Sequence, residues 1–319
     1  MKTGNYINPL YKLSQIDPQS VPRRISYSQW SIYEKCPKQW ELTYIKKLAP
    51  FNNSIELIFG TAFHETLQEY ITTMYTKTVK AADRLDLEQL LKERMSSEYR
   101  KAFEENGKIH FSTPSEMEEY LSDGIAILRW FLKRRAQYFS TKHWELIGIE
   151  VELCTQASKL NSSVYWYGFI DIVIKDTQDN KIIIFDIKTS RNGWNKWQKA
   201  DKLKAAQLVA YKNYYSEQFG FPKENIDIEF FIVKRKIDPD SMFPQKRIQQ
   251  IRPASGKVTQ KQVQTKIDKF VETCFDADGN KNEDREYVAL AGKGAKNCKW
   301  CPFKEDYESC PKENRIRTA

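Results

Sequence analysis

The sequence predicts an α/β fold in which a mainly helical N-terminal part precedes a mixed central sheet flanked by helices. Apolar residues recur at helical spacing in much of the first 140 residues, and the period changes to that of strands near residue 144. Helical spacing returns between and after the later strands. The chain has 319 residues and 40% hydrophobic content, which suffices for one large domain or two small ones.

The N-terminal part predicts an arm followed by helices. Residues 1–25 contain three prolines and little periodicity, so we expect an irregular arm. Two short helices should follow, broken at Cys36-Pro37, because the residue before a proline disfavours the helical conformation. Longer helices are predicted over residues 60–75, 84–105 and 115–139.

The second half of the sequence predicts the sheet. Strands are expected over residues 144–154, 164–175, 181–189 and 226–235. DTQDN, between the second and third of these, has turn chemistry and predicts an antiparallel hairpin. Helices are expected over residues 197–219 and 258–275. We expect one domain over residues 26–311, with a helical part (26–140), a core (141–275), a cysteine-rich segment (276–311) and a tail (312–319).

Charge and hydropathy narrow the class of protein. Lys and Arg total 51 against 42 Asp and Glu, which gives a net charge of +9 and a pI near 9.0 and fits a polyanionic partner such as nucleic acid. No apolar run approaches the roughly 20 residues that cross a bilayer. The N-terminus lacks the apolar core of a secretion signal. We therefore expect a soluble, cytoplasmic protein.

The stretch KIIIFDIKTS places charge on a buried strand. Asp186 and Lys188 lie two residues apart and therefore on one face of it. Asp171 interrupts the preceding strand in the same way, and a hairpin would bring the two carboxylates together. Their repulsion would be relieved by a divalent cation such as Mg²⁺ or Mn²⁺, with Lys188 beside it. The alternative is an ordinary salt bridge at the solvent edge of the sheet.

These residues resemble a known nuclease core. GFIDIV, a short turn and then FDIKTS resemble the PD-(D/E)XK nuclease superfamily, with Asp171 as the first acid and Asp186-Ile187-Lys188 as the (D/E)xK motif. Ile170 stands where the family name implies Pro. The resemblance implies a restriction-endonuclease-like mixed sheet flanked by helices.

Two further motifs resemble the RecB-like exonuclease branch of that superfamily. GTAFHE resembles its G-x-x-x-H-E helix, which implies that His64 is a metal ligand. QLVAY resembles its Q-x-x-x-Y helix, in which Gln207 and Tyr211 share one face. Glu150 and Glu152, on the preceding strand, are weaker candidates, because alternation on an exposed strand explains them equally well.

The resemblance also implies a mechanism. His64, Asp171, Asp186 and the backbone carbonyl of Ile187 would hold Mg²⁺ or Mn²⁺, and a bound water would attack the phosphodiester. Lys188 would orient that water or neutralise the developing charge. The product would carry a 5′-phosphate.

Three of the six cysteines form a C-x2-C-x8-C pattern, which is typical of a metal centre. These are Cys298, Cys301 and Cys310. One cysteine before the core and three after it resemble the iron–sulfur nucleases of the AddB type and of CRISPR adaptation, which implies that Cys36 is the fourth ligand of a [4Fe–4S] cluster. A zinc site with four cysteine ligands is the alternative. Cys154 and Cys274 lie in predicted strand and helix, where thiols are ordinary small apolar residues.

Aromatic and basic residues alternate after the active-site strand. Arg191, Trp194 and Trp197, with Tyr211, are candidates for holding single-stranded DNA by stacking and charge. A helix start with solvated lysines explains each of them as well.

The leading interpretation is a DNA exonuclease that acts on single strands or DNA ends in recombination, repair or phage DNA processing. The alternatives are an endonuclease or end-trimming factor of the CRISPR adaptation type, and a non-catalytic DNA-binding scaffold. The chain has no P-loop pattern, so a separate helicase or recombination protein would be the partner for work on duplex ends. A bacterial or phage origin would suit such a protein.

Overall fold

The computed structural model describes residues 6–9, 16–51, 53–238 and 240–317. They divide into two compact units. The first comprises the described residues within 1–13, 52–152 and 169–255, and the second those within 14–51, 153–168 and 256–319. Strands β3 (Trp144–Ser158) and β4 (Asn161–Asp176) contribute to both units. Within the described part of the chain, no helix has the length and apolar character needed to span a membrane.

The first unit is built on a mixed sheet with the strand order β1-β3-β4-β5-β6-β7. The strands added here are β1 (Tyr6–Ile7), β5 (Lys181–Ser190), β6 (Ile226–Lys234) and β7 (Ile248–Ile251). β4 and β5 form the predicted antiparallel hairpin, whose turn is stabilised by the Gln178 N–H donating to Asp176 Oδ1 at 2.9 Å. β5 and β6 are parallel, and β7 returns antiparallel to β6.

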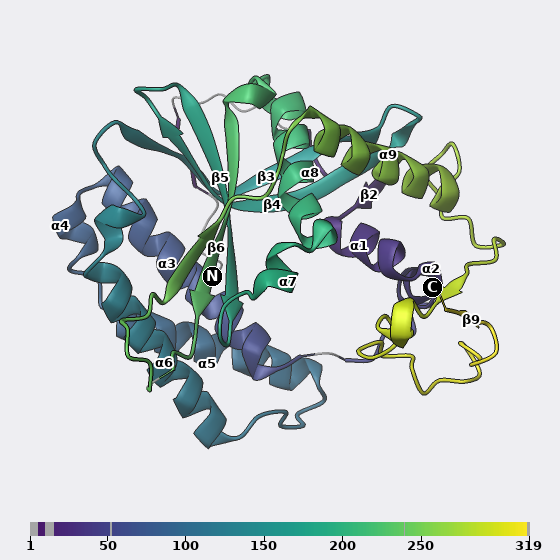
Figure 1. The fold of residues 1–319 in the computed structure, drawn as a ribbon, viewed down its shortest axis with the longest axis horizontal. Helices are drawn as coiled ribbons and strands as arrows, with labels where there is room; N and C mark the ends of the chain where they lie inside the picture. The colour runs from purple at the N-terminus through teal and green to yellow at the C-terminus, as the bar shows by residue number, and fades with distance from the viewer. Residues whose placement is uncertain (1–5, 10–15, 52, 239, 318–319) are drawn as a thin grey trace. The chain divides into compact units, whose positions relative to one another are not determined.

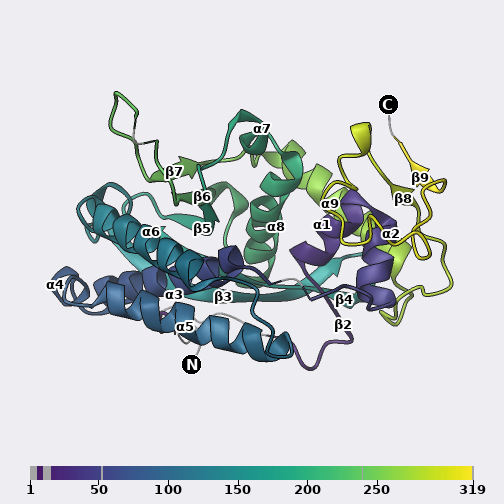
Figure 2. The same ribbon diagram turned by 90° about the horizontal axis from the view of Figure 1, so that it is seen from below.

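Helices cover both faces of β5 and β6 in this unit. On one face lie α3 (Ile55–Thr76), α5 (Leu87–Glu105) and α6 (Pro114–Leu132), with the short α4 (Val79–Ala82) beside α3. On the other lie α7 (Lys196–Lys199) and α8 (Lys202–Phe219). Figures 1 and 2 show β5 and β6 between the α3/α6 side and α8.

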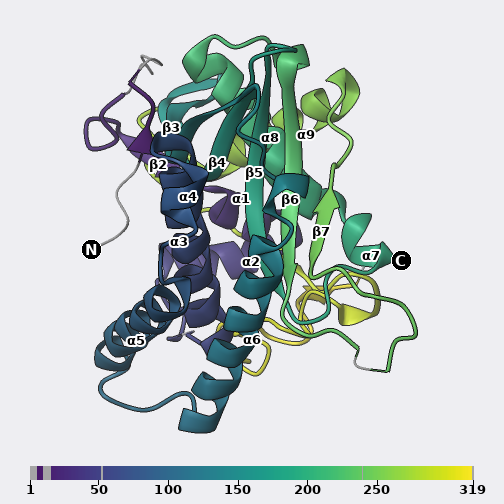
Figure 3. The same ribbon diagram turned by 90° about the vertical axis from the view of Figure 1, so that its left-hand side faces the viewer.

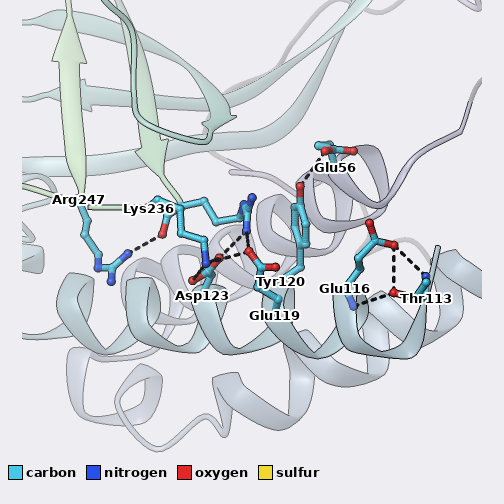
Figure 4. A network of polar contacts seen from close by, with 9 residues as sticks. Glu56, Thr113, Glu116, Glu119, Tyr120, Asp123, Lys236 and Arg247 are labelled. Carbon is cyan, nitrogen blue, oxygen red and sulfur yellow. Dashed lines mark hydrogen bonds and ion pairs between the residues drawn. The ribbon is translucent and has the colours of Figure 1, made fainter. Parts of the chain in front are cut away.

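The three long helices of the first face pack on one another and on the sheet. They lie side by side, as Figure 3 shows. Their apolar faces form one core with the strand residues that point toward them, including Ile172, Phe185 and Phe231. Thr113 caps α6 through a reciprocal pair with Glu116, in which each side chain accepts from the backbone N–H of the other (Figure 4). The side chains of Ser54 and Asp86 cap α3 and α5 in one direction only, so a side-chain oxygen marks the start of each of the three helices.

A glycine sets how closely α6 approaches its neighbours. A Cβ added at Gly124 would lie 2.5 Å from Leu91 Cδ2 and 2.9 Å from Phe59 Cε2. Leu91 and Phe59 are fully buried, so neither can move aside without disturbing the core.

The second unit is assembled from short elements and aromatic side chains. Its helices are α1 (Tyr27–Lys35), α2 (Pro37–Trp40), the π-helical η1 (Glu41–Ile45) and α9 (Lys257–Cys274). β2 (Arg23–Ile25) pairs in parallel with the first half of β4, and β8 (Ala289–Leu290) pairs with β9 (Arg315–Ile316). The ring centroid of Trp40 lies within 6.0 Å of those of Phe270, Phe275 and Tyr287.

Three single-turn 3₁₀ helices complete the described elements of the two units: η2 (Arg135–Gln137), η3 (Lys223–Asn225) and η4 (Lys293–Ala295).

The structure corrects several predicted boundaries. The helix predicted over 115–139 ends at Leu132, and the helix predicted over 197–219 is two helices, because Asn195 and Asp201 each cap a new N-terminus. β7 lies in a segment where no element was predicted. Residues 6–7 and 23–25 of the predicted irregular arm form the strands β1 and β2, and residues 1–5 and 10–15 lie outside the described residues. The division into arm, single domain and tail stays a prediction.

We expect Gly124→Ala to lower the free energy of unfolding by about 1–3 kcal/mol, because overpacking outweighs the roughly 1 kcal/mol that alanine gains over glycine in a helix. Urea unfolding followed by circular dichroism measures this. Gly256→Ala is the control: Gly256 is the N-cap of α9 and lies in open space, so the change should cost only the weaker capping by alanine, less than about 1 kcal/mol. Equal effects of the two substitutions would contradict the close approach of α6.

Candidate functional site

Two carboxylates lie side by side where β4 and β5 meet. Ile172 pairs with Phe185 in the antiparallel register, which sets Asp171 next to Asp186. Asp171 Oδ2 accepts a hydrogen bond from the backbone N–H of Ile187 at 2.6 Å. Asp186 is only 2% exposed. The hairpin therefore brings the two predicted acids together in the first unit.

Lys188 lies on the same face of β5 as Asp186 and pairs with it. Its Nζ donates to Asp186 Oδ1 at 2.9 Å and lies 2.8 Å from Oδ2. Burial acts to lower the pKa of Lys188, but the charges of Asp186 and Asp171 outweigh it, so the pKa is raised. Lys188 is therefore a fixed positive charge in the site.

His64 approaches the carboxylates from helix α3. Its Nδ1 lies 3.8 Å from Asp171 Oδ2. The pKa of His64 falls to about 3, chiefly because of burial and also because of the charge of Lys188, while hydrogen bonding with the backbone of Ile187 acts in the opposite direction. The imidazole is therefore neutral at physiological pH and keeps a nitrogen lone pair.

Gly60, one turn before His64, lets α3 lie close to β5. A Cβ at this position would come within 3.3 Å of Thr189 Oγ1, closer than most side-chain contacts. The glycine of the GTAFHE motif thus has a steric role in placing the histidine.

The ionised forms of Asp171 and Asp186 are destabilised in the folded protein. Burial raises the pKa of Asp171 well above its ordinary value, and the charges of Asp186 and Glu150 add to this, while Lys188 opposes it. Burial also raises the pKa of Asp186, against the effect of Lys188. Asp186 Oδ2 is buried and accepts no well-directed hydrogen bond from any described residue. An added cation would relieve each of these costs.

The donor set suits a divalent cation. Two carboxylates, a neutral imidazole and a backbone carbonyl are ligands that Mg²⁺ and Mn²⁺ accept. As the side chains lie, with Lys188 paired to Asp186, no group of three or more His, Cys, Asp or Glu in the described part of the chain is arranged to hold a metal ion.

Gln68 is a site residue that sequence reasoning missed. It lies one turn after His64 on α3 and is almost fully buried. Its Nε2 donates to Glu150 Oε1 at 2.5 Å and to the backbone carbonyl of Asp171 at 3.2 Å. The spacing from His64 (i, i+4) is the signal that could have found it.

Gln68 also distinguishes between the two glutamates of β3. Glu150 has a backbone φ of 49°, which is rare for a non-glycine residue in a strand and marks a local irregularity of β3. This irregularity brings its carboxylate to Gln68 and close enough to raise the pKa of Asp171. The backbone carbonyl of Glu152 instead accepts from Gln218.

Gln207 and Tyr211 share one face of α8, as their spacing predicts. Gln207 Nε2 donates to Tyr211 Oη at 3.2 Å. The pKa of Tyr211 is raised by burial and then by the charges of Asp186 and Asp171, so its hydroxyl faces the acidic pair. Tyr211 remains protonated and can donate a hydrogen bond in the site.

The residues predicted to contact DNA differ in their exposure to solvent. Arg191 is exposed just beyond β5, and Trp197 is 74% exposed with Lys196 over its ring. Trp194 is only 9% exposed and packs on Phe230, with ring centroids 4.8 Å apart. A buried ring offers no face to a base, so of the two tryptophans only Trp197 is exposed enough to remain a candidate for stacking.

The four cysteines of the predicted cluster line one cavity in the second unit. This cavity is bounded by Cys36, Cys298, Cys301, Cys310 and the apolar side chains of Leu42 and Phe303, among others. Burial raises the pKa of Cys301, and the charges of the other three thiols add to it. Cys36 Sγ accepts the backbone N–H of Leu290 at 3.3 Å. Cys154 and Cys274 are buried elsewhere as ordinary core residues.

Comparison with known proteins gives one finding. A family model described as the PD-(D/E)XK nuclease superfamily matches residues 24–306, which is most of the chain. A search of curated proteins found no match. The mixed sheet flanked by helices is consistent with the restriction-endonuclease-like fold of that superfamily.

In EDTA, we expect Asp171→Asn to raise the free energy of unfolding at pH 7 by about 1–2 kcal/mol. The pKa of Asp171 in the folded protein lies above its ordinary 3.8. The wild type therefore loses stability as the pH rises from below 3.8 through that raised pKa, whereas asparagine does not titrate. With excess Mn²⁺ the order should reverse, because only the wild type keeps both carboxylates for the cation. Thermal unfolding at pH 4, 5.5 and 7, with and without Mn²⁺, measures this.

The control for that experiment is Asp179→Asn, in the exposed turn between β4 and β5. It should change stability by less than about 0.5 kcal/mol in either condition. A wild type that is the more stable protein in EDTA at pH 7 would show that the carboxylate pair is not strained.

Proposed function

The chain belongs to the PD-(D/E)XK nuclease superfamily, and we propose that within it this protein is a metal-dependent DNA exonuclease of the RecB-like branch. The superfamily consists of nucleases, which hydrolyse nucleic acids and generally use divalent metals such as Mg²⁺ or Mn²⁺. The proposal concerns the metal, the substrate and the mode of cleavage.

One observation carries the proposal. His64, Asp171, Asp186 and Lys188 come from a helix and two strands and meet at one point of the first unit. A solvent-edge salt bridge would involve only the Asp186–Lys188 pair. It would not explain the buried neutral histidine or the second carboxylate.

The residues present fit a divalent cation. His64, Asp171, Asp186 and the carbonyl of Ile187 would hold it, and it would supply an acidified water and charge neutralisation at the scissile phosphate. Lys188, paired to Asp186, holds a positive charge where the attacking water or the phosphate oxygens would lie. The Tyr211 hydroxyl, which accepts from Gln207, would donate its own proton toward the same place.

Support for a DNA exonuclease comes from the motifs of α3 and α8. GTAFHE and QLVAY resemble motifs of the RecB-like branch. Gly60 allows α3 to approach β5, and Gln207 bonds to Tyr211, whose pKa responds to the carboxylates. The exposed Trp197, with Lys196 against its ring, suits a single strand or a frayed DNA end. A separate helicase or recombination protein would supply such ends.

We further propose a [4Fe–4S] cluster on Cys36, Cys298, Cys301 and Cys310. Four thiols in one cavity with apolar walls suit a soft metal centre. The Leu290 N–H directed at Cys36 Sγ is the kind of bond that stabilises a cluster thiolate. The group would join the start of the second unit to its C-terminal segment.

We expect the wild type to release label from end-labelled single-stranded DNA in Mg²⁺ or Mn²⁺, and to release none in EDTA. Asp186→Ala should lower the rate by at least about 100-fold, because it removes a predicted metal ligand and leaves Lys188 unpaired. Gel analysis of 5′- and 3′-labelled substrates measures the rate and gives the polarity.

Asp179→Ala is the matched control and should cleave like the wild type. Internal cuts in circular DNA would replace the exonuclease with an endonuclease. A wild type that binds DNA but cleaves nothing with either metal would favour the non-catalytic scaffold.

For the cysteines, we expect anaerobically purified protein to contain about four iron atoms per chain, with acid-labile sulfide. Cys298→Ala should lose both, whereas Cys154→Ala, which removes a thiol outside the cavity, should keep them. Elemental analysis and visible absorbance measure this. One zinc per chain without iron would replace the cluster by a tetrahedral zinc site.

A further inference from the structure

A polar pocket opens at the carboxyl ends of the parallel strands β5 and β6. It has a volume of about 120 Å³. Its lining residues are Glu56, Phe59, Tyr120, Thr189, Ser190, Arg191 and Arg235. In sheets with parallel strands, this end is where ligands commonly bind.

The pocket begins where the catalytic strand leaves the metal site. Thr189, Ser190 and Arg191 directly follow Lys188, and two residues of a strand span about 6.6 Å. Arg235 lies beside them, because its backbone N–H donates to the carbonyl of Ser190 at 2.8 Å. Arg191 and Arg235 therefore lie just beyond the ends of the neighbouring strands β5 and β6. Arg191 is three residues after Lys188.

Arg235 is a buried cation held in one orientation. Its side chain is 7% exposed, and its guanidinium lies 3.8 Å from the centroid of the Tyr120 ring. Its Nη1 donates to Glu119 Oε1 at 2.8 Å and to Asp123 Oδ2 at 2.6 Å. Figure 4 shows Glu119, Tyr120 and Asp123 within about one turn of α6, near the ends of β5 and β6.

The carboxylates around the pocket already have partners. Glu119 and Asp123 also pair with Lys236, and Glu56 accepts from the Tyr120 hydroxyl at 2.8 Å (Figure 4). These pairs hold Arg235 in place without using all of its donors.

Several hydrogen-bond donors of the pocket have no acceptor among the described residues. None of the described residues accepts a hydrogen bond from Nε or Nη2 of Arg235, from the guanidinium of Arg191 or from the Thr189 hydroxyl. Glu56 also lines the pocket, but its carboxylate accepts from the Tyr120 hydroxyl. The free donors of Arg235, Arg191 and Thr189 suit an anion with several oxygens, and a forked guanidinium suits a phosphate.

We propose that this pocket binds a phosphate group of the DNA strand adjacent to the scissile one and thereby sets the register of cleavage. The proposal rests on the proposed nuclease function. The phosphate is either an internal phosphodiester or the terminal phosphate of a strand end, and both offer the same oxygens to the two arginines.

The first test measures binding without turnover. Fluorescent single-stranded oligonucleotides are titrated in Ca²⁺ over a range of salt concentrations. Arg191→Ala should raise the Kd about tenfold and lower the slope of log K against log salt by about 0.7, the value for one phosphate contact on a single strand. Lys181→Ala, which removes the same charge at the other end of β5, should change the Kd less than twofold.

The second test locates the contact. A single uncharged methylphosphonate linkage is moved along a substrate, and cleavage at each bond is mapped in Mg²⁺. In the wild type, a neutral linkage next to the scissile bond should lower cleavage about tenfold. In the Thr189→Val/Arg191→Ala variant the same linkage should cause no further loss, since the partner groups are already absent.

Strand ends distinguish the two sources of phosphate. If the wild type prefers a 5′-phosphate to a 5′-hydroxyl and Arg191→Ala loses that preference, the pocket takes the terminal phosphate. If circular and linear strands bind equally and depend equally on Arg191, it takes an internal one.

The proposal is overturned if Arg191→Ala behaves like Lys181→Ala, or if no methylphosphonate position removes the difference between wild type and variant. The second result would reduce Arg191 to a diffuse surface charge. A wild type that binds DNA but cleaves none contradicts the nuclease function alone. The salt slope and the comparison with Lys181→Ala still decide the pocket in that case.

Discussion

The structure of the site depends on two buried carboxylates that share one lysine. Asp171 and Asp186 come together because antiparallel pairing sets them side by side, and burial makes their joint ionisation costly. Lys188 compensates only in part, since its amino group pairs with Asp186. A fold selected only for stability would place apolar residues here. A bound cation would relieve the remaining strain, and it would give the neutral histidine and the buried acceptor beside them a common role.

The backbone of β3, the strand next to β4, is also strained. Glu150 adopts a left-handed backbone conformation inside β3, which costs on the order of 1 kcal/mol or more for a non-glycine residue. Gln68 donates to its carboxylate and to the backbone of Asp171 at once. These two bonds couple the irregular segment of β3 to β4, the strand that carries Asp171. The position of Asp171 is therefore set from two sides, by the Ile187 N–H and by Gln68.

Sequence patterns predicted the parts of this site that depend on neighbours along the chain. Asp186 and Lys188 follow from strand alternation, and Gln207 and Tyr211 from helical spacing. The conformation of Glu150 could not be predicted, because GIEVEL alternates like any regular strand. The pocket at the ends of β5 and β6 could not be predicted either, since Tyr120 and Arg235 are more than 100 residues apart and only packing joins them. The burial of Trp194 could not be predicted either, because an aromatic residue among lysines and arginines has the same sequence pattern whether its ring is exposed or packed on a neighbour.

Helix α3 gives these separate features a common frame. Glu56 and Phe59 line the pocket at the ends of β5 and β6, and Gly60 allows close contact with β5. Further along the helix, His64 lies beside Asp171 and Gln68 donates to Glu150. Four residues of helix span about 6 Å, close to the 6.6 Å that two residues of a strand span beside it. One turn of α3 and two residues of β5 therefore cover similar distances between the pocket and the carboxylates. In the proposed nuclease, this match would hold two successive phosphates of one strand against a single rigid frame, so that the distance between binding and cleavage is set by backbone geometry rather than by flexible side chains.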